Sequence, residues 1–407
     1  MIGGGAAGYF AAISAIENVS SLRISIYEKS SKLLSKVKIS GGGRCNVTHS
    51  CFTPKELVKF YPRGGQELLG PFFGWQPSDT VEWFKNHDVP LKTESDGRIF
   101  PTTDSSQTII DCFNKCLSNG GVNLFTKVAV ENFAKIDTGE GFELSLSDGN
   151  TIRSKTVIIA TGGGQSSGGL KLARKFGHTV TKLSPSLFTF HIKDPRINGL
   201  QGLSVNQVAV SCPDLGLTTR GPMLVTHWGL SGPAILKLSS LGARDFQQLQ
   251  YKFQIIINWT GGLSQDETQQ RLNEFRKSHG PKRLESGCPF SLPKRIWERI
   301  ILASEIEPKK QWAQLNKEQL KNLVEQISSS LFSVSGKSMN KDEFVTCGGV
   351  SLKEVDFRSM ESKFTKGLFF AGEVLDIDGV TGGFNFQAAW TTGRLAGVSA
   401  SESVLNL

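Results

Sequence analysis

Long apolar runs are missing from this 407-residue sequence. A helix that crosses a membrane needs a run of about 18 or more apolar residues, so no transmembrane segment is predicted. No signal peptide is visible at the start, and low-complexity tracts are also missing. With 38% hydrophobic residues, the chain is expected to be a soluble globular protein of two or three domains.

Histidine is scarce, and its six copies are scattered, so no metal site is predicted. The seven cysteines are an odd number in a chain too large to need disulfides, which predicts a reducing compartment. That compartment is the cytoplasm, or an organelle if an upstream targeting segment has been removed. Cys112 and Cys116 are expected to pack in the core. Cys45 and Cys51 are one residue too far apart for the C-x4-C pair of flavin disulfide reductases.

Acidic residues are outnumbered, with 37 Asp and Glu against 46 Lys and Arg, a formal charge of +9. The basic residues are dispersed, and the densest patches ("KVK", "PKK", "PKR") are short. A basic soluble protein with anionic small-molecule ligands is therefore favoured over a nucleic-acid-binding protein. The oligomeric state is left open by the sequence.

The opening "MIGGGAAGYF" contains the pattern Gly3-x-Gly5-x-x-Gly8. In a dinucleotide-binding turn the first glycine permits the tight turn, the second admits a pyrophosphate, and the third lets helix and strand pack closely. The following "AAGYFAAISAIE" predicts a helix whose N-terminus, at Ala6 and Ala7, would present free N–H groups to phosphate.

A strand pattern, "LRISIYEK", follows and ends at Glu28, twenty positions after Gly8. A carboxylate at this place suits the hydroxyls of a ribose. Only Met1 and Ile2 precede the glycines, although the strand before such a turn is usually about five residues long. We therefore expect that the start has been shortened.

A second glycine turn, Thr161-Gly162-Gly163-Gly164, follows the apolar strand Val157 to Ala160. Its third glycine falls one position late, and no acidic residue stands twenty positions further on. A separate NAD(P) domain is therefore not predicted, and the turn is expected to return the chain beneath the first dinucleotide.

The chain ends are predicted to build one domain and the middle another. Residues 1–183 and 344–407 read as a discontinuous Rossmann-like α/β domain, and 184–343 as an inserted β-rich domain. Within the insertion, helical patterns at 264–278, 293–306 and 316–331 predict a helical subdomain at about 262–333.

The segment "GLFFAGEVLDIDGVTGGFNFQAA" predicts a strand that delivers Gly372 and Glu373, then a helix from Gly383-Phe384-Asn385 to about Ala396. A flavin gains negative charge at its N1/O2 edge on reduction, and a helix N-terminus stabilises that anion. Together with the first glycine turn, this favours FAD over a glycine loop that merely caps a helix.

The stretch "KISGGGRCNVTH" places three glycines, ending at Gly43, before Arg44, Cys45 and Asn46. Arg44 is a candidate bidentate donor to the pyrophosphate and Asn46 a candidate partner of the ring. A plain surface loop is the alternative. In the insertion, "THWGLSGPAIL" contains His227, a candidate for proton transfer near neutral pH, although a lone histidine is more often structural.

These motifs together resemble one family, the bacterial-type FAD-dependent oxidoreductases that include the BaiN and RdsA-like proteins and aminoacetone oxidase. The likeness covers nearly the whole chain and includes "GGGAAG", "ISGGGRCNVTH", "GRIFPTTD", "THWGLSGPAIL" and "TCGGV". Leu34 and Ser35 depart from it, because they stand where the family usually has Gly-Arg.

The resemblance implies non-covalent FAD in the discontinuous domain, with NAD(P)H as a candidate transient reductant. The expected cofactor residues are Gly3, Gly5, Ala6, Ala7, Gly8, Glu28, Lys29, Lys36, Gly43, Arg44, Cys45, Asn46, Val128, Ala160, Thr161, Gly162, Gly372, Glu373, Gly383, Phe384 and Asn385. His227, Arg98 and Asn385 are the catalytic or substrate-contact candidates.

The expected activity is transfer of hydride equivalents between flavin and a small amine, ketone or enone. Two alternatives stay open: a flavoenzyme that modifies structured RNA, and a flavin-binding sensor without catalysis.

Overall fold

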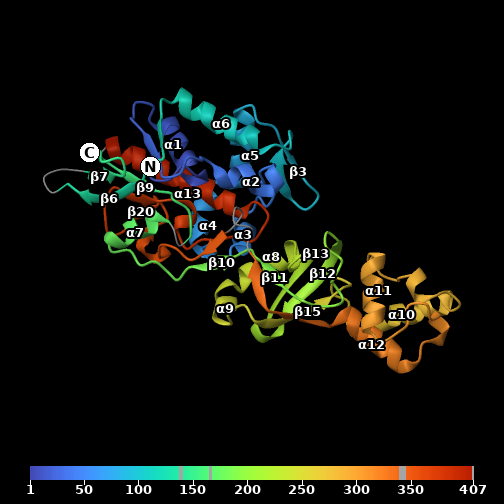
Figure 1. The fold of residues 1–407 in the computed structure, drawn as a ribbon. Helices are drawn as coiled ribbons and strands as arrows, with labels where there is room; N and C mark the ends of the chain where they lie inside the picture. The colour runs from blue at the N-terminus through green and yellow to red at the C-terminus, as the bar shows by residue number, and fades with distance from the viewer. Residues whose placement is uncertain (137–140, 165–166, 339–344, 406–407) are drawn as a thin grey trace. The chain divides into compact units, whose positions relative to one another are not determined.

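The computed structural model describes residues 1–136, 141–164, 167–338 and 345–405. The chain divides into two compact units, Met1–Ser184 with Lys341–Leu407 (unit 1) and Pro185–Asn340 (unit 2). Figure 1 shows that the blue and red ends of the chain both belong to unit 1.

Unit 1 is built on a parallel sheet. Strand β9 (Val157–Ile159) pairs in parallel with β21 (Leu368–Phe370), and β1 (Ser25–Glu28) pairs in parallel with β5 (Asn123–Thr126). Ile2 forms parallel bridges to Ile159 on one side and to Tyr27 on the other. The two residues before the glycines therefore lie in strand register between β9 and β1.

Two helices of small residues pack on this sheet. The helices α1 (Ala6–Asn18) and α13 (Phe384–Leu405) pack closely against each other. A Cβ placed on Gly397 would lie 2.2 Å from the Ala11 carbonyl oxygen. This close approach requires glycine and joins the two ends of the chain in one layer.

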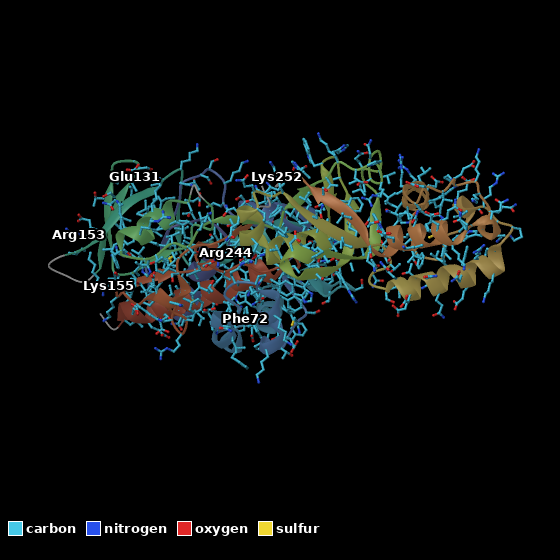
Figure 2. The ribbon with its side chains drawn as sticks, turned by 90° about the horizontal axis from the view of Figure 1, so that it is seen from below. Phe72, Glu131, Arg153, Lys155, Arg244 and Lys252 are labelled. Carbon is cyan, nitrogen blue, oxygen red and sulfur yellow. The ribbon has the colours of Figure 1, made fainter. Side chains whose placement is uncertain are left out.

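The remaining elements of unit 1 surround this core. Its other helices are α2 (Ser35–Gly43), α3 (Pro54–Leu57), α4 (Gly65–Gly74), α5 (Pro77–Asn86), α6 (Ser106–Asn119) and α7 (Gly168–Lys175). Its other strands are β2 (Thr48–His49), β3 (Leu91–Thr93), β4 (Arg98–Pro101), β6 (Val130–Lys135), β7 (Phe142–Leu146), β8 (Thr151–Ser154), β18 (Val345–Cys347), β19 (Val355–Asp356) and β20 (Glu361–Ser362). Figure 2 labels Glu131 on β6, Arg153 on β8 and Lys155 just after β8, together with the buried Phe72 of α4.

Unit 2 contains a seven-stranded sheet in the order β16-β15-β12-β13-β14-β11-β17. Its strands are β11 (Thr189–His191), β12 (Ser204–Cys212), β13 (Leu217–Val225), β14 (Gly229–Ser231), β15 (Phe253–Asn258), β16 (Ser330–Val334) and β17 (Gly336–Ser338). The helices are α8 (Pro233–Leu241) and α9 (Ala243–Gln248), then α10 (Gln265–His279), α11 (Lys294–Ala303) and α12 (Lys317–Ser328). The last three form the helical subdomain (Figure 1).

Some predicted boundaries were wrong. The pattern 316–331 runs three residues past the end of α12, because α12 ends at Ser328 and β16 begins at Ser330. The C-terminal helix continues nine residues beyond Ala396, to Leu405. The bounds of α2 include the three glycines, but the backbone leaves the helical conformation at Ser40, Gly41 and Gly42. Among the described residues, no helix combines the length and the apolar character that crossing a membrane requires.

Candidate cofactor site

The first glycine turn has the conformation that a dinucleotide turn needs. Gly3 has φ 111°, and a Cβ on Gly8 would lie 2.1 Å from the Gly3 carbonyl oxygen. Gly5 is the N-cap of α1, receives no side-chain cap, and would carry a Cβ with nothing within 4 Å. The first N–H groups of α1, at Ala6 and Ala7, thus lack an intrahelical partner and are open to an anion.

The Glu28 carboxylate lies over this turn. It accepts hydrogen bonds from the Gly4 N–H at 2.9 Å and from the Ser30 N–H at 2.8 Å. Val128 lies beside it, because its N–H donates to the Glu28 carbonyl at 3.1 Å. The structure therefore brings together Glu28, predicted for the ribose, and Val128, another expected cofactor residue, with Lys29 exposed next to them.

A second group joins α2 to the end of β21. Lys36 Nζ donates to Glu373 Oε2 at 2.6 Å, and the Thr346 N–H donates to Glu373 Oε1 at 3.0 Å. Gly372 has φ 72°, and its N–H donates to Thr392 of α13. The Lys36–Glu373 pair is half-exposed, so it orients the two side chains more than it stabilises the fold.

Four of the five residues from Gly41 to Cys45 lie in the left-handed region, and Arg44, with φ −91°, is the exception. Gly41, Gly42 and Gly43 have φ of 58°, 70° and 86°, and Cys45 has φ 63°. A Cβ on Gly42 or Gly43 would have nothing within 4 Å, so the backbone there is open to a ligand. Burial raises the pKa of the Cys45 thiol to about 12, which keeps it protonated and unreactive at neutral pH.

The guanidinium of Arg44 is engaged by a residue that the sequence analysis missed. Arg44 Nη1 donates to Glu94 Oε1 at 2.6 Å, and its guanidinium lies 4.0 Å from the centre of the Phe100 ring. Arg98 Nη2 donates to the other oxygen of Glu94 at 2.9 Å. Glu94 therefore links a predicted cofactor residue to a predicted substrate residue, which no spacing rule indicates.

The N-terminus of α13 is the part of the site that suits a flavin. Gly382 and Gly383 have φ of 136° and 92°, and Asn385 bonds the backbone of Gly379 through both its amide atoms, at 2.8 and 2.9 Å. The Asn46 amide accepts from the Gly383 N–H at 2.9 Å in the orientation that satisfies both its ends. Asn46 and Asn385 hold the turn in shape and leave the next N–H groups without an intrahelical partner.

A set of contacts that the sequence did not indicate holds this turn in place. Arg63 Nε donates to Asp378 Oδ1 at 2.5 Å, and Asp378 is fully buried. The Tyr61 hydroxyl donates to the Phe384 carbonyl at 2.7 Å, and Phe60 stacks on the Phe384 ring at 4.3 Å. We call Phe60, Tyr61, Arg63 and Asp378 the α13 clamp. No motif marked it, because an ion pair between distant segments has no sequence period.

The turn after β9 also adjoins the glycines. The Ala160 N–H donates to the Ile2 carbonyl at 2.8 Å, and the Thr161 hydroxyl pairs with that of Ser167 at 2.8 Å. Gly162 has φ 72°, and a Cβ there would meet only Glu373, at 4.0 Å.

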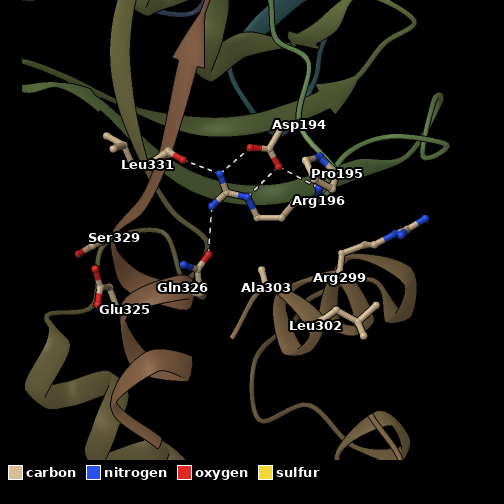
Figure 3. A pocket seen from close by; sticks show the side chains of 10 residues that line it. All are labelled: Asp194, Pro195, Arg196, Arg299, Leu302, Ala303, Glu325, Gln326, Ser329 and Leu331. Atoms are coloured by element: carbon tan, nitrogen blue, oxygen red, sulfur yellow. Dashed lines mark hydrogen bonds and ion pairs between the residues drawn. The ribbon is translucent and has the colours of Figure 1, made fainter. Parts of the chain in front are cut away.

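His227 belongs to unit 2, where it is exposed in the turn between β13 and β14. Unit 2 also has a pocket of about 560 Å³ where the sheet meets α11 and α12, shown in Figure 3. Arg196 is held there by Asp194 (2.7 Å), by Gln326 (3.0 Å) and by the Leu331 carbonyl (2.5 Å). The guanidinium is thus fully used in joining the helices to the sheet.

The residues of unit 1 fit an FAD molecule. Open glycines at Gly5, Gly42 and Gly43 supply backbone that a bulky group can approach, and the N-terminus of α1 supplies N–H groups that no side chain caps. The carboxylate of Glu28 stands where a ribose would bond it.

Comparison with known proteins agrees with this geometry. Residues 1–399 match the family described as HI0933-like protein Rossmann domain. The ribosomal RNA dihydrouridine synthase of Escherichia coli (strain K12) is 32% identical over 399 residues, covering 96% of this chain and 95% of that protein. The 3-dehydro-bile acid delta(4,6)-reductase of Clostridium scindens is 26% identical over 419 residues, covering 99% and 98%.

Among solved structures, 3-ketosteroid-delta4-(5alpha)-dehydrogenase from Rhodococcus jostii RHA1 is similar with a TM-score of 0.53 and 15% identity, covering 98% of this chain and 95% of that one. At this identity the likeness concerns the fold alone. The predicted fold class, a Rossmann-like FAD-binding domain within a mixed α/β chain, is confirmed.

Proposed function

Because the chain belongs to the HI0933-like family of FAD-dependent oxidoreductases, we propose that it reduces a carbon–carbon double bond conjugated to a carbonyl, in a uridine of ribosomal RNA. The observation that carries this proposal is the 32% identity, over 95% of its length, to a ribosomal RNA dihydrouridine synthase.

The named relatives share one kind of bond. In uracil the C5=C6 double bond is conjugated to the C4 carbonyl, so uridine is an enone in chemical terms. A 3-dehydro-bile acid with double bonds at positions 4 and 6 is likewise conjugated to its C3 carbonyl. One site chemistry therefore serves both substrates, and the shape of the substrate pocket decides between them.

When bound, reduced FAD would supply the hydride for this double bond, and a proton would complete the reduction to a single bond. The two electrons come from a reduced nicotinamide, for which we propose transient binding, since neither glycine turn offers a second nucleotide domain.

The chain's own residues would position the cofactor and stabilise the charge of its reduced form. Ala6 and Ala7 would bind the pyrophosphate, and Glu28 the ribose. The α13 N-terminus would hold the negative charge of the reduced ring, because its dipole is positive at that end. The α13 clamp keeps that N-terminus in place, so it acts on the chemistry without touching the substrate.

The charge distribution supports a nucleic-acid substrate more than the total charge suggested. Unit 2 contains 19 of the 46 Lys and Arg residues and 12 of the 37 Asp and Glu residues, a charge of +7. Unit 1 contains the other 27 and 25, a charge of +2. A basic inserted unit favours binding of a polyanion.

The test is nucleoside mass spectrometry of unmodified ribosomal RNA incubated anaerobically with the FAD-loaded protein and NADPH or NADH. We expect dihydrouridine to form, and we expect Gly5→Val, which fills the open side of the turn, to form none. If the wild-type protein makes no dihydrouridine in RNA or in intact ribosomal subunits, the proposal is wrong.

A second candidate is reduction of a small enone, favoured by the 26% identity to a bile acid reductase. It predicts oxidation of the reduced flavin by a 3-oxo-4-ene steroid and no product in RNA. A flavin-binding sensor predicts neither reaction.

A further inference from the structure

We propose that the exposed face of Trp228 is a stacking platform for an unpaired nucleobase of RNA. This inference rests on the proposed function, because it names the part of unit 2 that would bind the RNA. The Trp228 platform consists of Trp228, His191 and three neighbouring hydroxyl residues, Thr189, Ser231 and Ser338.

Trp228 stands apart from the other tryptophans. All seven lie in the described residues: Trp83, Trp259, Trp297, Trp312 and Trp390 are buried, and Trp75 is half-buried. Trp228 is 64% exposed, although exposing an indole to water gives up the burial that such a large ring normally provides. An exposed tryptophan is therefore a candidate contact residue.

The indole is backed by a second ring. The His191 imidazole stacks on it with ring centres 5.5 Å apart and planes 20° apart. His191 is held in turn by the Ser338 hydroxyl, which pairs with its Nε2. Burial, and then the charge of Lys337, lower the pKa of His191, so the backing ring is neutral at physiological pH.

The backbone beneath the indole is fixed. The Trp228 carbonyl accepts from the Ile192 N–H at 3.0 Å, and the Thr226 N–H donates to the Gly229 carbonyl at 2.8 Å across the turn. Gly229 has φ 146°, and a Cβ there would lie 2.4 Å from the Phe190 carbonyl oxygen. The platform is preorganised, so little conformational entropy is lost when a base stacks on it.

Polar groups line the same side of the sheet. Alternation along β11 places Thr189 and His191 on one face and the buried Phe190 on the other. The Thr189 hydroxyl donates to that of Ser231 at 3.0 Å, and Ser338 is paired with Thr189 in register. These hydroxyls can donate to and accept from base edges and ribose, which an apolar partner would not need.

The positive charge of unit 2 favours RNA as the ligand of the platform, over a protein segment or an apolar molecule. Unit 2 carries a charge of +7, and Arg244 and Lys252 are exposed on it (Figure 2). Base stacking on an aromatic ring and a basic surface together are the usual means of binding single-stranded nucleic acid.

The experiment measures binding without turnover, using oxidised FAD-loaded protein and a fluorescein-labelled oligouridylate at constant low salt. We expect Trp228→Ala to weaken binding about tenfold, and Trp228→Phe, which keeps a ring, to stay within a few-fold of wild type. Phe73→Ala is the matched control, because Phe73 is an aromatic residue of unit 1 that is 67% exposed. It should leave the affinity unchanged.

Two further readouts separate stacking from a structural role. Tryptophan emission should fall on RNA binding in the wild type and in Phe73→Ala, and the fall should be lost in Trp228→Phe. A duplex of the same length should bind more weakly, since its bases are not free to stack. Equal affinity of Trp228→Ala and wild type, or equal affinity for duplex and single strand, would overturn the platform.

The platform and the proposed function can fail separately. If wild type makes dihydrouridine and Trp228→Ala binds RNA equally well, only the platform is wrong. If Trp228→Ala loses binding but wild type makes no dihydrouridine, the platform stands and the proposed reaction is wrong.

Discussion

The two units offer different kinds of candidate binding site. In unit 1 the candidate site is mostly backbone: glycines with positive φ and the N-termini of α1 and α13, in a unit of nearly balanced charge. In unit 2 the distinctive features are side chains, an exposed tryptophan and an excess of basic residues. Backbone sites demand glycine at set places and are therefore visible in a sequence. Side-chain surfaces depend on the fold that gathers them.

Each unit also contains a largely buried Arg–Asp pair, Arg63–Asp378 in unit 1 and Arg196–Asp194 in unit 2. Removing the arginine of these pairs should have the largest effects on stability. Arg63→Ala leaves the fully buried Asp378 without its main partner and should cost about 3–5 kcal/mol of unfolding free energy. Because the α13 clamp is lost, FAD binding should fall as well. Urea unfolding and FAD titration check both; wild-type FAD affinity in this variant would contradict the clamp's role.

Arg196→Ala is the corresponding change in unit 2. The Arg196 and Asp194 side chains are 13% and 18% exposed, so the cost should be smaller, about 2–3 kcal/mol. The loss should appear as easier proteolysis of the helical subdomain, with the FAD content unchanged. Loss of FAD in this variant would mean that the two units are not independent.

Glu28→Gln tests the carboxylate in unit 1. It retains the shape but weakens the bonds to ribose, and FAD should bind about tenfold more weakly, roughly 1.4 kcal/mol. Glu131→Gln is the control, an exposed glutamate of β6 in the same unit. Isothermal titration measures the FAD affinity of both variants. Equal FAD affinities of Glu28→Gln and Glu131→Gln would show that Glu28 does not bind the cofactor.

The smallest expected effect is a pH dependence confined to unit 1. Burial lowers the pKa of His178 from its usual 6.5, while the Glu354 carboxylate, 3.3 Å from Nδ1, opposes the shift. The folded state thus favours the neutral ring. Its contribution is fully present above the unfolded pKa of about 6.5 and is lost as the pH falls toward the folded pKa. His178→Phe should therefore weaken the fall of the urea midpoint that accompanies acidification below about pH 6.5; parallel curves of midpoint against pH for the two proteins would contradict this.

Much of unit 1 could be predicted from the sequence because local rules govern it. The turn at Gly3–Gly8, the strand ending at Glu28 and the α13 start at Gly383 follow from φ requirements and apolar periods. Leu34 shows the limit: it adopts φ 51° where the resembled family usually has glycine, at a cost of about 1–2 kcal/mol, so the loop keeps its shape against local preference.

What escaped prediction depends on contacts between distant segments. The pairs Arg63–Asp378 and Arg44–Glu94 join residues far apart in the sequence. The end of α12 was misplaced because Ser329 to Leu331 continue the helical apolar pattern, and pairing of β16 with β15 overrides it. The Trp228–His191 stack likewise needs β11 beside β14.

The most direct test of the central claim follows the flavin itself. The FAD-loaded protein is reduced by light under anaerobic conditions and mixed with unmodified ribosomal RNA, with a 3-oxo-4-ene steroid, or with buffer. The account predicts that RNA restores the visible absorption of oxidised flavin, with one dihydrouridine formed per flavin oxidised. If the flavin stays reduced with RNA and is oxidised by the steroid, the proposed substrate is wrong.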